Sequence, residues 1–152
     1  MAEVLVVDDD PDIRTLVAFA LEDSGFAVRQ APHGAAALVA MEERAPDAIV
    51  LDVMMPALDG FGVLAARRQR SLAPQARVII LTCKTEERDY LLGWELGAHE
   101  YLTKPFDPEL LVDKLHELMG VSLDVLHQRR EAELQKARLL DRLAVAFTRN
   151  QA

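Results

Sequence analysis

The sequence has a single cysteine, Cys83, and no apolar run that approaches the roughly 18 residues needed by a membrane-spanning helix. One cysteine cannot form an internal disulfide, so stability must come from a packed core. The first apolar run, Val4 to Val7, is only four residues long, and no basic segment precedes it. This is not the pattern of a secretory signal. We therefore expect a cytoplasmic protein with no membrane segment.

Positive charge is scarce over most of the chain. The 152 residues carry a net charge of −8, which divides into −10 over residues 1–120 and +2 over residues 121–152. An acidic body argues against direct binding to nucleic acid, and the small basic excess at the end does not argue for it. DNA binding is therefore expected only through an effector domain that this chain does not contain.

Residues 121–152 contain neither glycine nor proline, the two strongest helix breakers. Ser122 is placed to cap a helix to about Phe147, roughly 40 Å long at 1.5 Å per residue. A heptad frame through this helix is broken by Arg130 and Glu133, so a coiled coil and a solvated helix both remain open. We predict a domain over residues 1–120 and a helical extension over 121–152, the extension being the least protected part unless it self-associates.

Short apolar runs alternate with amphipathic segments five times before residue 120. Such alternation predicts a parallel sheet with helices on both faces. Right-handed crossovers then favour a doubly wound α/β fold, a (βα)5 flavodoxin-like sandwich with strand order 2-1-3-4-5. The expected strands lie at about 4–7, 26–30, 47–52, 77–82 and 99–102, and the expected helices at about 11–24, 34–44, 60–70, 86–96 and 107–119.

Polar residues end four of the five expected strands. Asp8 and Asp9 follow the first, Asp52 ends the third, Thr82 ends the fourth and Lys104 follows the fifth. The carboxyl ends of parallel strands meet at the edge where open sheets bind ligands. Clustered carboxylates repel one another and suit a hard cation such as Mg²⁺. An aspartate can also attack phosphorus, supported by an ammonium and a hydroxyl group, so the set predicts phosphate chemistry.

These stretches resemble the receiver domain of two-component response regulators, a CheY-like domain. The resemblance implies that Asp52 accepts a phosphoryl group from a sensor histidine kinase. The chain would be a signalling switch rather than an enzyme, with only self-phosphorylation and self-dephosphorylation chemistry. The motifs that carry the resemblance are Val6 to Asp10, Asp47 to Gly60, Ile80 to Thr82 and Gly97 to Phe106.

The resemblance also implies a role for each residue of the metal and phosphate site. Asp9 and Asp52 would ligate Mg²⁺ directly, together with the backbone carbonyl of Met54. Asp8 would act largely through water. Lys104 would pair with a phosphoryl oxygen.

A second group of roles concerns the switch. Thr82 would bond the phosphoryl group and pull its loop inward, and Tyr101 matches the aromatic residue that moves with it. The peptide bond between Lys104 and Pro105 is expected to be cis. Cys83 departs from the family pattern, because receivers usually carry Ala, Ser or Gly after the switch threonine.

Two other readings compete with this one. A Mg²⁺-dependent phosphatase or phosphotransferase of the haloacid-dehalogenase type also forms an aspartyl phosphate, and Asp8 and Asp10 have its two-residue spacing. That reading leaves Asp52 unexplained and needs a cap domain for which the chain has no room. A pure interaction module would normally have lost Asp52 or Lys104, and both are present.

The expected helix at 86–96 carries two apolar sets, of which a sheet can bury one. We therefore predict an exposed partner surface that includes Tyr90, Trp94 and Leu110. Family resemblance places the output and dimer surface of receivers on the same face, formed by the fourth helix, fifth strand and fifth helix. Glu100 and Lys114 could form an ion pair there. Self-association as a homodimer through this face is the expected consequence of phosphorylation.

Overall fold

The computed structural model describes residues 1–83 and 87–150, with the backbone alone at positions 87 and 88. Its centre is a parallel sheet of five strands in the order β2-β1-β3-β4-β5, so the predicted strand order is confirmed. The order in which the chain adds strands reverses between β1 and β3, which are paired neighbours. The strands are β1 (Glu3–Val7), β2 (Ala27–Ala31), β3 (Ala48–Asp52), β4 (Arg77–Thr82) and β5 (Glu100–Thr103).

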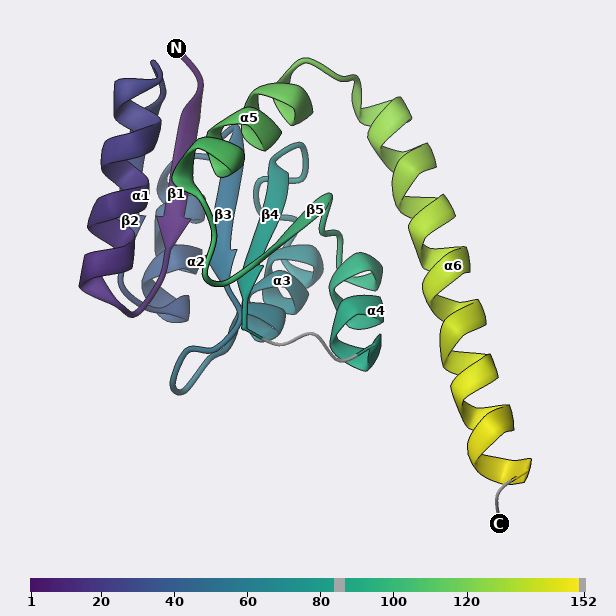
Figure 1. The fold of residues 1–152 in the computed structure, drawn as a ribbon. Coiled ribbons are helices and arrows are strands. Elements are labelled where there is room, and N and C mark those ends of the chain that lie inside the picture. Colours follow the sequence, from purple (N-terminus) through teal and green to yellow (C-terminus); the bar gives the residue numbers. More distant parts are fainter. Residues whose placement is uncertain (84–86, 151–152) are drawn as a thin grey trace.

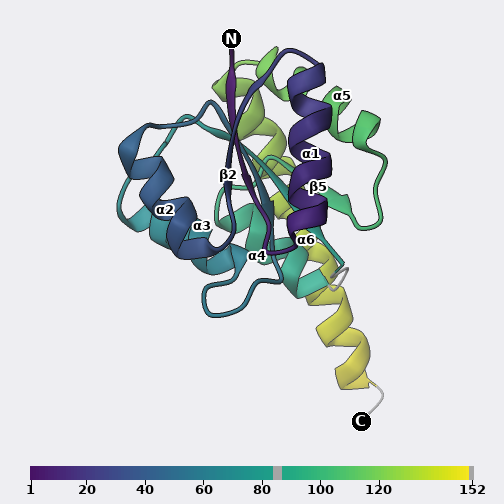
Figure 2. The same cartoon turned by 90° about the vertical axis from the view of Figure 1, so that its left-hand side faces the viewer.

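Helices cover both faces of the sheet, as the alternation predicts (Figures 1 and 2). One face packs against α1 and α5, and the other against α2 and α3, while α4 lies next to β5. None of the helices in the described ranges has the length and apolar character to cross a membrane. The helices are α1 (Pro11–Asp23), α2 (Gly34–Glu43), α3 (Gly60–Gln69), α4 (Glu87–Glu95), α5 (Pro108–Met119) and α6 (Leu123–Asn150).

The central strands are buried on both faces, which explains their continuous apolar sequence. Every residue of β3, from Ala48 to Asp52, is buried. Side chains of β1 alternate between the two cores, with Leu5 and Val7 facing α2 and α3 and with Val4 and Val6 facing α1 and α5. A polar residue in such a strand costs free energy unless something in the fold compensates it. Asp52 therefore requires a specific explanation.

Helix caps hold the loops at the carboxyl edge of the sheet. The carboxylate of Asp10 accepts hydrogen bonds from the backbone at the start of α1, and Asp59 and Asp107 do the same for α3 and α5. Pro11 and Pro108 occupy the first helical position, where no N–H group is needed. Each loop thus passes from strand to helix with little freedom.

The first half of α6 packs against the domain rather than standing in solvent. It runs beside α4, and its residues Leu126, Leu134 and Ala137 are between 2% and 4% exposed. Leu126 joins the core formed by α1 and α5. Of the two alternatives left open by the sequence, the solvated helix does not apply to residues 126–137. The second half of α6 extends past the sandwich (Figure 1) and exposes apolar side chains such as Leu143 and Phe147.

The two charged residues that break the heptad frame of α6 both bond to α4. Arg130 donates from Nη1 to the carbonyl of Trp94 at 3.5 Å, and Glu133 accepts from the hydroxyl of Tyr90 at 3.2 Å. Trp94 is only 4% exposed as a result of its packing, so the prediction that it lies on an open surface is wrong. Tyr90 is half-buried, and Leu110 on α5 is 46% exposed.

His99, which precedes β5, is a structural residue. Its Nδ1 accepts the backbone N–H of Val78 at 3.0 Å, an interaction that requires the neutral ring. Burial, followed by the positive charges of Arg67 and Arg130, lowers the pKa of His99 to about 4. The unfolded chain binds more protons than the folded one between about pH 6.5 and pH 4, so stability falls as pH falls through that window.

Replacement of His99 by Asn should remove this pH dependence, because Asn keeps an acceptor but does not titrate. We expect the loss of unfolding free energy between pH 7 and pH 4.5 to be smaller by about 2 kcal/mol in His99→Asn. Urea unfolding across this pH range measures it. His116→Asn, which removes an exposed imidazole from α5, is the control and should follow wild type. Parallel curves for wild type and His99→Asn would contradict the assignment.

Candidate functional site

Four strand ends meet at one edge of the sheet, as predicted. Asp8 follows β1, Asp52 ends β3 and Thr82 ends β4, and these side chains are 1%, 4% and 2% exposed. Asp9 is exposed beside them. The pairing of Asp52 with Leu81 in the sheet places Thr82 one residue beyond the aspartate on the adjacent strand. The edge thus carries buried carboxylates and a buried hydroxyl in a small volume.

Lys104 reaches this edge from the end of β5. Its Nζ lies 3.0 Å from Oδ2 of Asp8 and 3.3 Å from Oδ1 of Asp52. The backbone N–H of Lys104 donates to the carbonyl of Thr82 at 2.9 Å, and the following peptide bond to Pro105 is cis, as predicted. The ammonium group is therefore held against two carboxylates that are distant in the sequence.

One ammonium does not neutralise the carboxylates around it. Burial, and then the charge of Asp8, raises the pKa of Asp52 to about 6 in spite of Lys104. Burial works to lower the pKa of Lys104, but the hydrogen bond with Asp8 and the charge of Asp52 raise it above its usual value. Lys104 faces a cluster of three carboxylates, so negative charge is in excess at this edge, and the charges of Asp8 and Asp52 act on these pKa values in that sense. The site therefore favours a cation.

The described residues provide a suitable set of ligands for that cation. Carboxylate oxygens of Asp8, Asp9 and Asp52 lie within 4.8 Å of one another. Opposite ligands of a Mg²⁺ ion are separated by about 4.2 Å, so small movements of these side chains would close the shell. Three carboxylates without nitrogen or sulfur ligands are typical of a hard ion that keeps several waters.

The loop after β3 shapes the other side of the site. The backbone N–H of Met54 donates to Oδ1 of Asp52 at 3.3 Å, while its carbonyl as a metal ligand stays a prediction. Gly60 at the start of α3 packs directly on this loop. A Cβ at Gly60 would lie 2.4 Å from the carbonyl oxygen of Asp52, so glycine is required there for close approach rather than as a turn residue.

Tyr101 connects the site to α4. Its hydroxyl donates to the carbonyl of Asp89 at 2.8 Å, and its ring lies 4.9 Å from that of Tyr90 and 5.9 Å from that of Trp94. The residue that makes room for it is Gly93, since a Cβ there would lie 1.8 Å from the Tyr101 hydroxyl oxygen. Gly93 was not anticipated from the sequence, although a glycine inside a helix is a signal of close packing.

A doubly wound sandwich with a buried aspartate, a neighbouring acidic pair, a lysine and a threonine at its carboxyl edge defines an aspartate-centred phosphoacceptor fold. The family model for the response regulator receiver domain matches residues 4–116 of this chain. The chain therefore belongs to the response regulator receiver family. It is a phosphoacceptor signalling module of the two-component type.

Curated relatives agree with this assignment. The chain is 49% identical over 106 residues to the alkaline phosphatase synthesis transcriptional regulatory protein PhoP of Bacillus subtilis, and this covers 70% of the chain and 43% of PhoP. It is 38% identical over 112 residues to the DNA-binding response regulator MtrA of Mycolicibacterium smegmatis, covering 74% of the chain and 48% of MtrA. The chain spans somewhat less than half the length of these relatives.

Solved structures show the same fold. Chemotaxis protein CheY4 of Vibrio cholerae is 37% identical with a TM-score of 0.73, over 77% of this chain and 98% of CheY4. Response regulator TrrA of Thermotoga maritima, solved in complex with Mg²⁺ and beryllium fluoride, is 33% identical with a TM-score of 0.69, over 78% of this chain and 99% of TrrA.

The haloacid-dehalogenase alternative does not fit the site. That reading pairs Asp8 with Asp10, but the Asp10 carboxylate accepts the backbone N–H groups of Asp12 and Ile13 and caps α1. Asp52, which the alternative leaves without a role, lies in the carboxylate cluster instead. The family match also excludes it.

Replacement of Gly93 by Ala tests whether Tyr101 depends on this glycine. Alanine in a helix gains about 1 kcal/mol over glycine, but overpacking costs about 1–3 kcal/mol. We expect Gly93→Ala to destabilise the wild type by about 1 kcal/mol and to stabilise a Tyr101→Ala background, where only the helix gain remains. Denaturant unfolding of the four proteins measures this cycle. The same sign in both backgrounds would contradict the packing described.

Proposed function

We propose that Asp52 accepts a phosphoryl group from a sensor histidine kinase, in a reaction that uses Mg²⁺ bound at Asp8, Asp9, Asp52 and the Met54 carbonyl. The observation that carries the proposal is the contact of Lys104 with both Asp8 and Asp52 at the edge of the sheet. Residues 1–120 would form the receiver and residues 121–152 an extension that serves the output. A cytoplasmic location is part of the same proposal.

The chain's own groups fit the chemistry. Lys104 and the Met54 N–H both approach Oδ1 of Asp52, which leaves Oδ2 to form the bond to phosphorus while the bond from phosphorus to the donor breaks. Lys104 and the hydroxyl of Thr82 would then compensate charge on the phosphoryl oxygens. Bound Mg²⁺ supplies further positive charge at the same oxygens. Self-dephosphorylation would follow by attack of water on phosphorus, which breaks the bond to Oδ2 of Asp52, restores the carboxylate and releases inorganic phosphate.

Acetyl phosphate with Mg²⁺ should add one phosphoryl group to the wild-type protein, and Asp52→Asn should remove the acceptor. Asp9→Asn should lower Mg²⁺ affinity and labelling at least tenfold by removing one ligand. Asp10→Asn is the matched control, because Asn also caps α1 and the residue lies outside the cluster. Intact-mass spectrometry counts the phosphoryl groups. Wild-type labelling of Asp52→Asn would overturn the assignment of the acceptor.

We also propose that the output acts through the face that α6 covers. Tyr101 contacts Tyr90 and Trp94, and Tyr90 bonds to Glu133 of α6, so a continuous set of contacts runs from β5 to the extension. Movement of Thr82 and Tyr101 on phosphorylation would weaken this packing and release α6. Release would uncover Tyr90 and Trp94 next to Leu110, which is already exposed. The face formed by these three residues would then be free for a second copy of the chain or another partner. Binding to DNA would require an effector domain outside these residues.

Activation with beryllium fluoride and Mg²⁺ should lower the hydrogen-exchange protection of residues 126–137 at least tenfold, while α1 keeps its protection. Thr82→Ala should bind beryllium fluoride yet show a smaller response, because it removes the hydroxyl group that would move. Sedimentation at several concentrations then asks whether release is followed by dimerisation, which Leu110→Ala should weaken. Leu110 is preferred to Trp94, whose truncation would leave a cavity in the α4–α6 contact. Unchanged protection of residues 126–137 on activation would refute the release of α6.

A further inference from the structure

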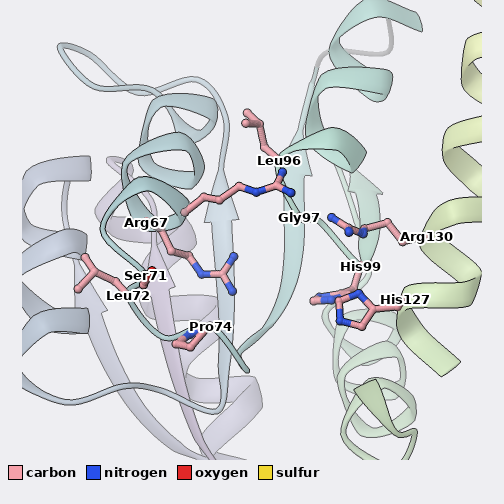
Figure 3. Close-up of a pocket in the computed structure, with 10 residues that line it drawn as sticks. Arg67, Ser71, Leu72, Pro74, Leu96, Gly97, His99, His127 and Arg130 are labelled. Carbon is pink, nitrogen blue, oxygen red and sulfur yellow. The ribbon is translucent and has the colours of Figure 1, made fainter. Parts of the chain in front are cut away.

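A second polar pocket lies away from the carboxylate cluster, between the carboxyl end of α3, the start of β5 and α6 (Figure 3). Its volume is about 200 Å³. Most of its polar lining consists of arginine and histidine side chains, and Leu72, Pro74 and Leu96 line it as well. The basic side chains that line it are Arg67, Arg68, His99, His127 and Arg130.

Two of the guanidinium groups converge from opposite sides of this pocket. Arg67 on α3 and Arg130 on α6 both approach Gly97, where a Cβ would lie 3.5 Å from Nη1 of Arg67 and 4.0 Å from Nη1 of Arg130. Figure 3 shows the two side chains entering from different elements. Arg67 is only 7% exposed. Two positive charges that approach the same glycine repel one another, and an anion between them would offset that repulsion.

No carboxylate among the described residues lines the pocket. Arg67 donates from Nη2 to the carbonyl of Ala73 at 2.9 Å, Arg68 donates to the carbonyl of Glu95, and Arg130 donates to that of Trp94 at 3.5 Å. These partners are neutral. Within the described structure, the buried Nε atoms of Arg67 and Arg130 have no hydrogen-bond partner. Unpaired donors of this kind are costly when buried, and they leave the two guanidinium charges incompletely compensated, so an anion in the pocket would be favoured by charge.

We propose that this pocket binds a small anion through a phosphate group, either free phosphate or a compact phosphate monoester. Donors from Arg67, Arg130 and His127 approach from α3 and α6, and a tetrahedral oxyanion offers acceptors in several directions where a planar carboxylate offers two oxygens in one plane. The apolar lining residues leave space for a short organic group attached to the phosphate. A pocket of about 200 Å³ can enclose a small ligand of this kind but not a polymer.

Such an anion would connect the receiver body to α6. Arg67 belongs to α3, whereas Arg130 and His127 belong to α6, so a ligand that contacts all three stabilises the docked position of α6. The site uses none of the residues of the carboxylate cluster. Anion binding can therefore be measured without phosphorylation, and either proposal can fail without the other.

The test uses the whole chain with EDTA present, so that phosphate has no metal through which to reach the aspartates. Inorganic phosphate and glycerol phosphate are titrated separately against chloride at matched ionic strength. Fluorescence of Trp94, the only tryptophan, reports binding next to Arg130, and hydrogen exchange of residues 126–137 reports docking of α6. Wild type should gain protection in that segment. A response to glycerol phosphate alone would identify the monoester as the ligand class.

Variants separate a built site from general attraction to positive charge. Arg130→Gln should weaken phosphate binding at least tenfold, while Arg142→Gln, which removes the same charge from an exposed position on α6, should bind as wild type does. Asp52→Asn should also bind normally. His127→Gln is the second test if Arg130→Gln destabilises the contact with α4, and it should weaken binding severalfold. Equal binding by Arg130→Gln and Arg142→Gln, or no response of wild type to either phosphate compound, would overturn the proposal.

Discussion

The contact of one lysine with two buried aspartates is the interaction on which the functional edge of this protein depends. Lys104, Asp8 and Asp52 come from the ends of three different strands, and only the parallel order of β1, β3, β4 and β5 brings them together. The arrangement leaves negative charge in excess, because Asp8, Asp9 and Asp52 lie together against a single ammonium group, and burial and Asp8 raise the pKa of Asp52 in spite of Lys104. A site of this kind is held ready for positive charge and for a phosphoryl group, at some cost to the stability of the metal-free fold.

The same strand ends link the edge to the far side of the domain. Thr82 and Tyr101 lie on neighbouring strands, and Tyr101 lies in the space left by Gly93 with its hydroxyl on the backbone of α4. Because α6 bonds to α4 at Tyr90 and Trp94, a continuous set of contacts joins Tyr101 to the extension.

Two features of the extension affect its docking in opposite senses. Leu126, Leu134 and Ala137 bury apolar surface, which favours docking without regard to any ligand. Arg130 brings a guanidinium group near Arg67 and Arg68, whose positive charges oppose docking and would be offset by the proposed anion. Under the two proposals, the docked state of α6 responds both to the aspartate edge and to the arginine pocket.

Most of the fold and of the aspartate site could be predicted from the sequence, because both depend on local pattern. Apolar runs that end in Asp8, Asp52 and Thr82 specify buried strands with polar ends, and the handedness of the crossovers then specifies the strand order. The position of α6 could not be predicted, since a helix with charged residues at Arg130 and Glu133 is equally compatible with solvent until the backbone carbonyl and tyrosine that bond them are located. Burial of Trp94 and Arg67 and the need for glycine at position 93 likewise depend on which elements lie opposite. The sequence by itself determined the strands, their order and the chemistry at their ends. Only the tertiary structure decided which face the extension covers and which arginines face one another. The reason is that those contacts join residues whose spacing in the sequence carries no periodic signal.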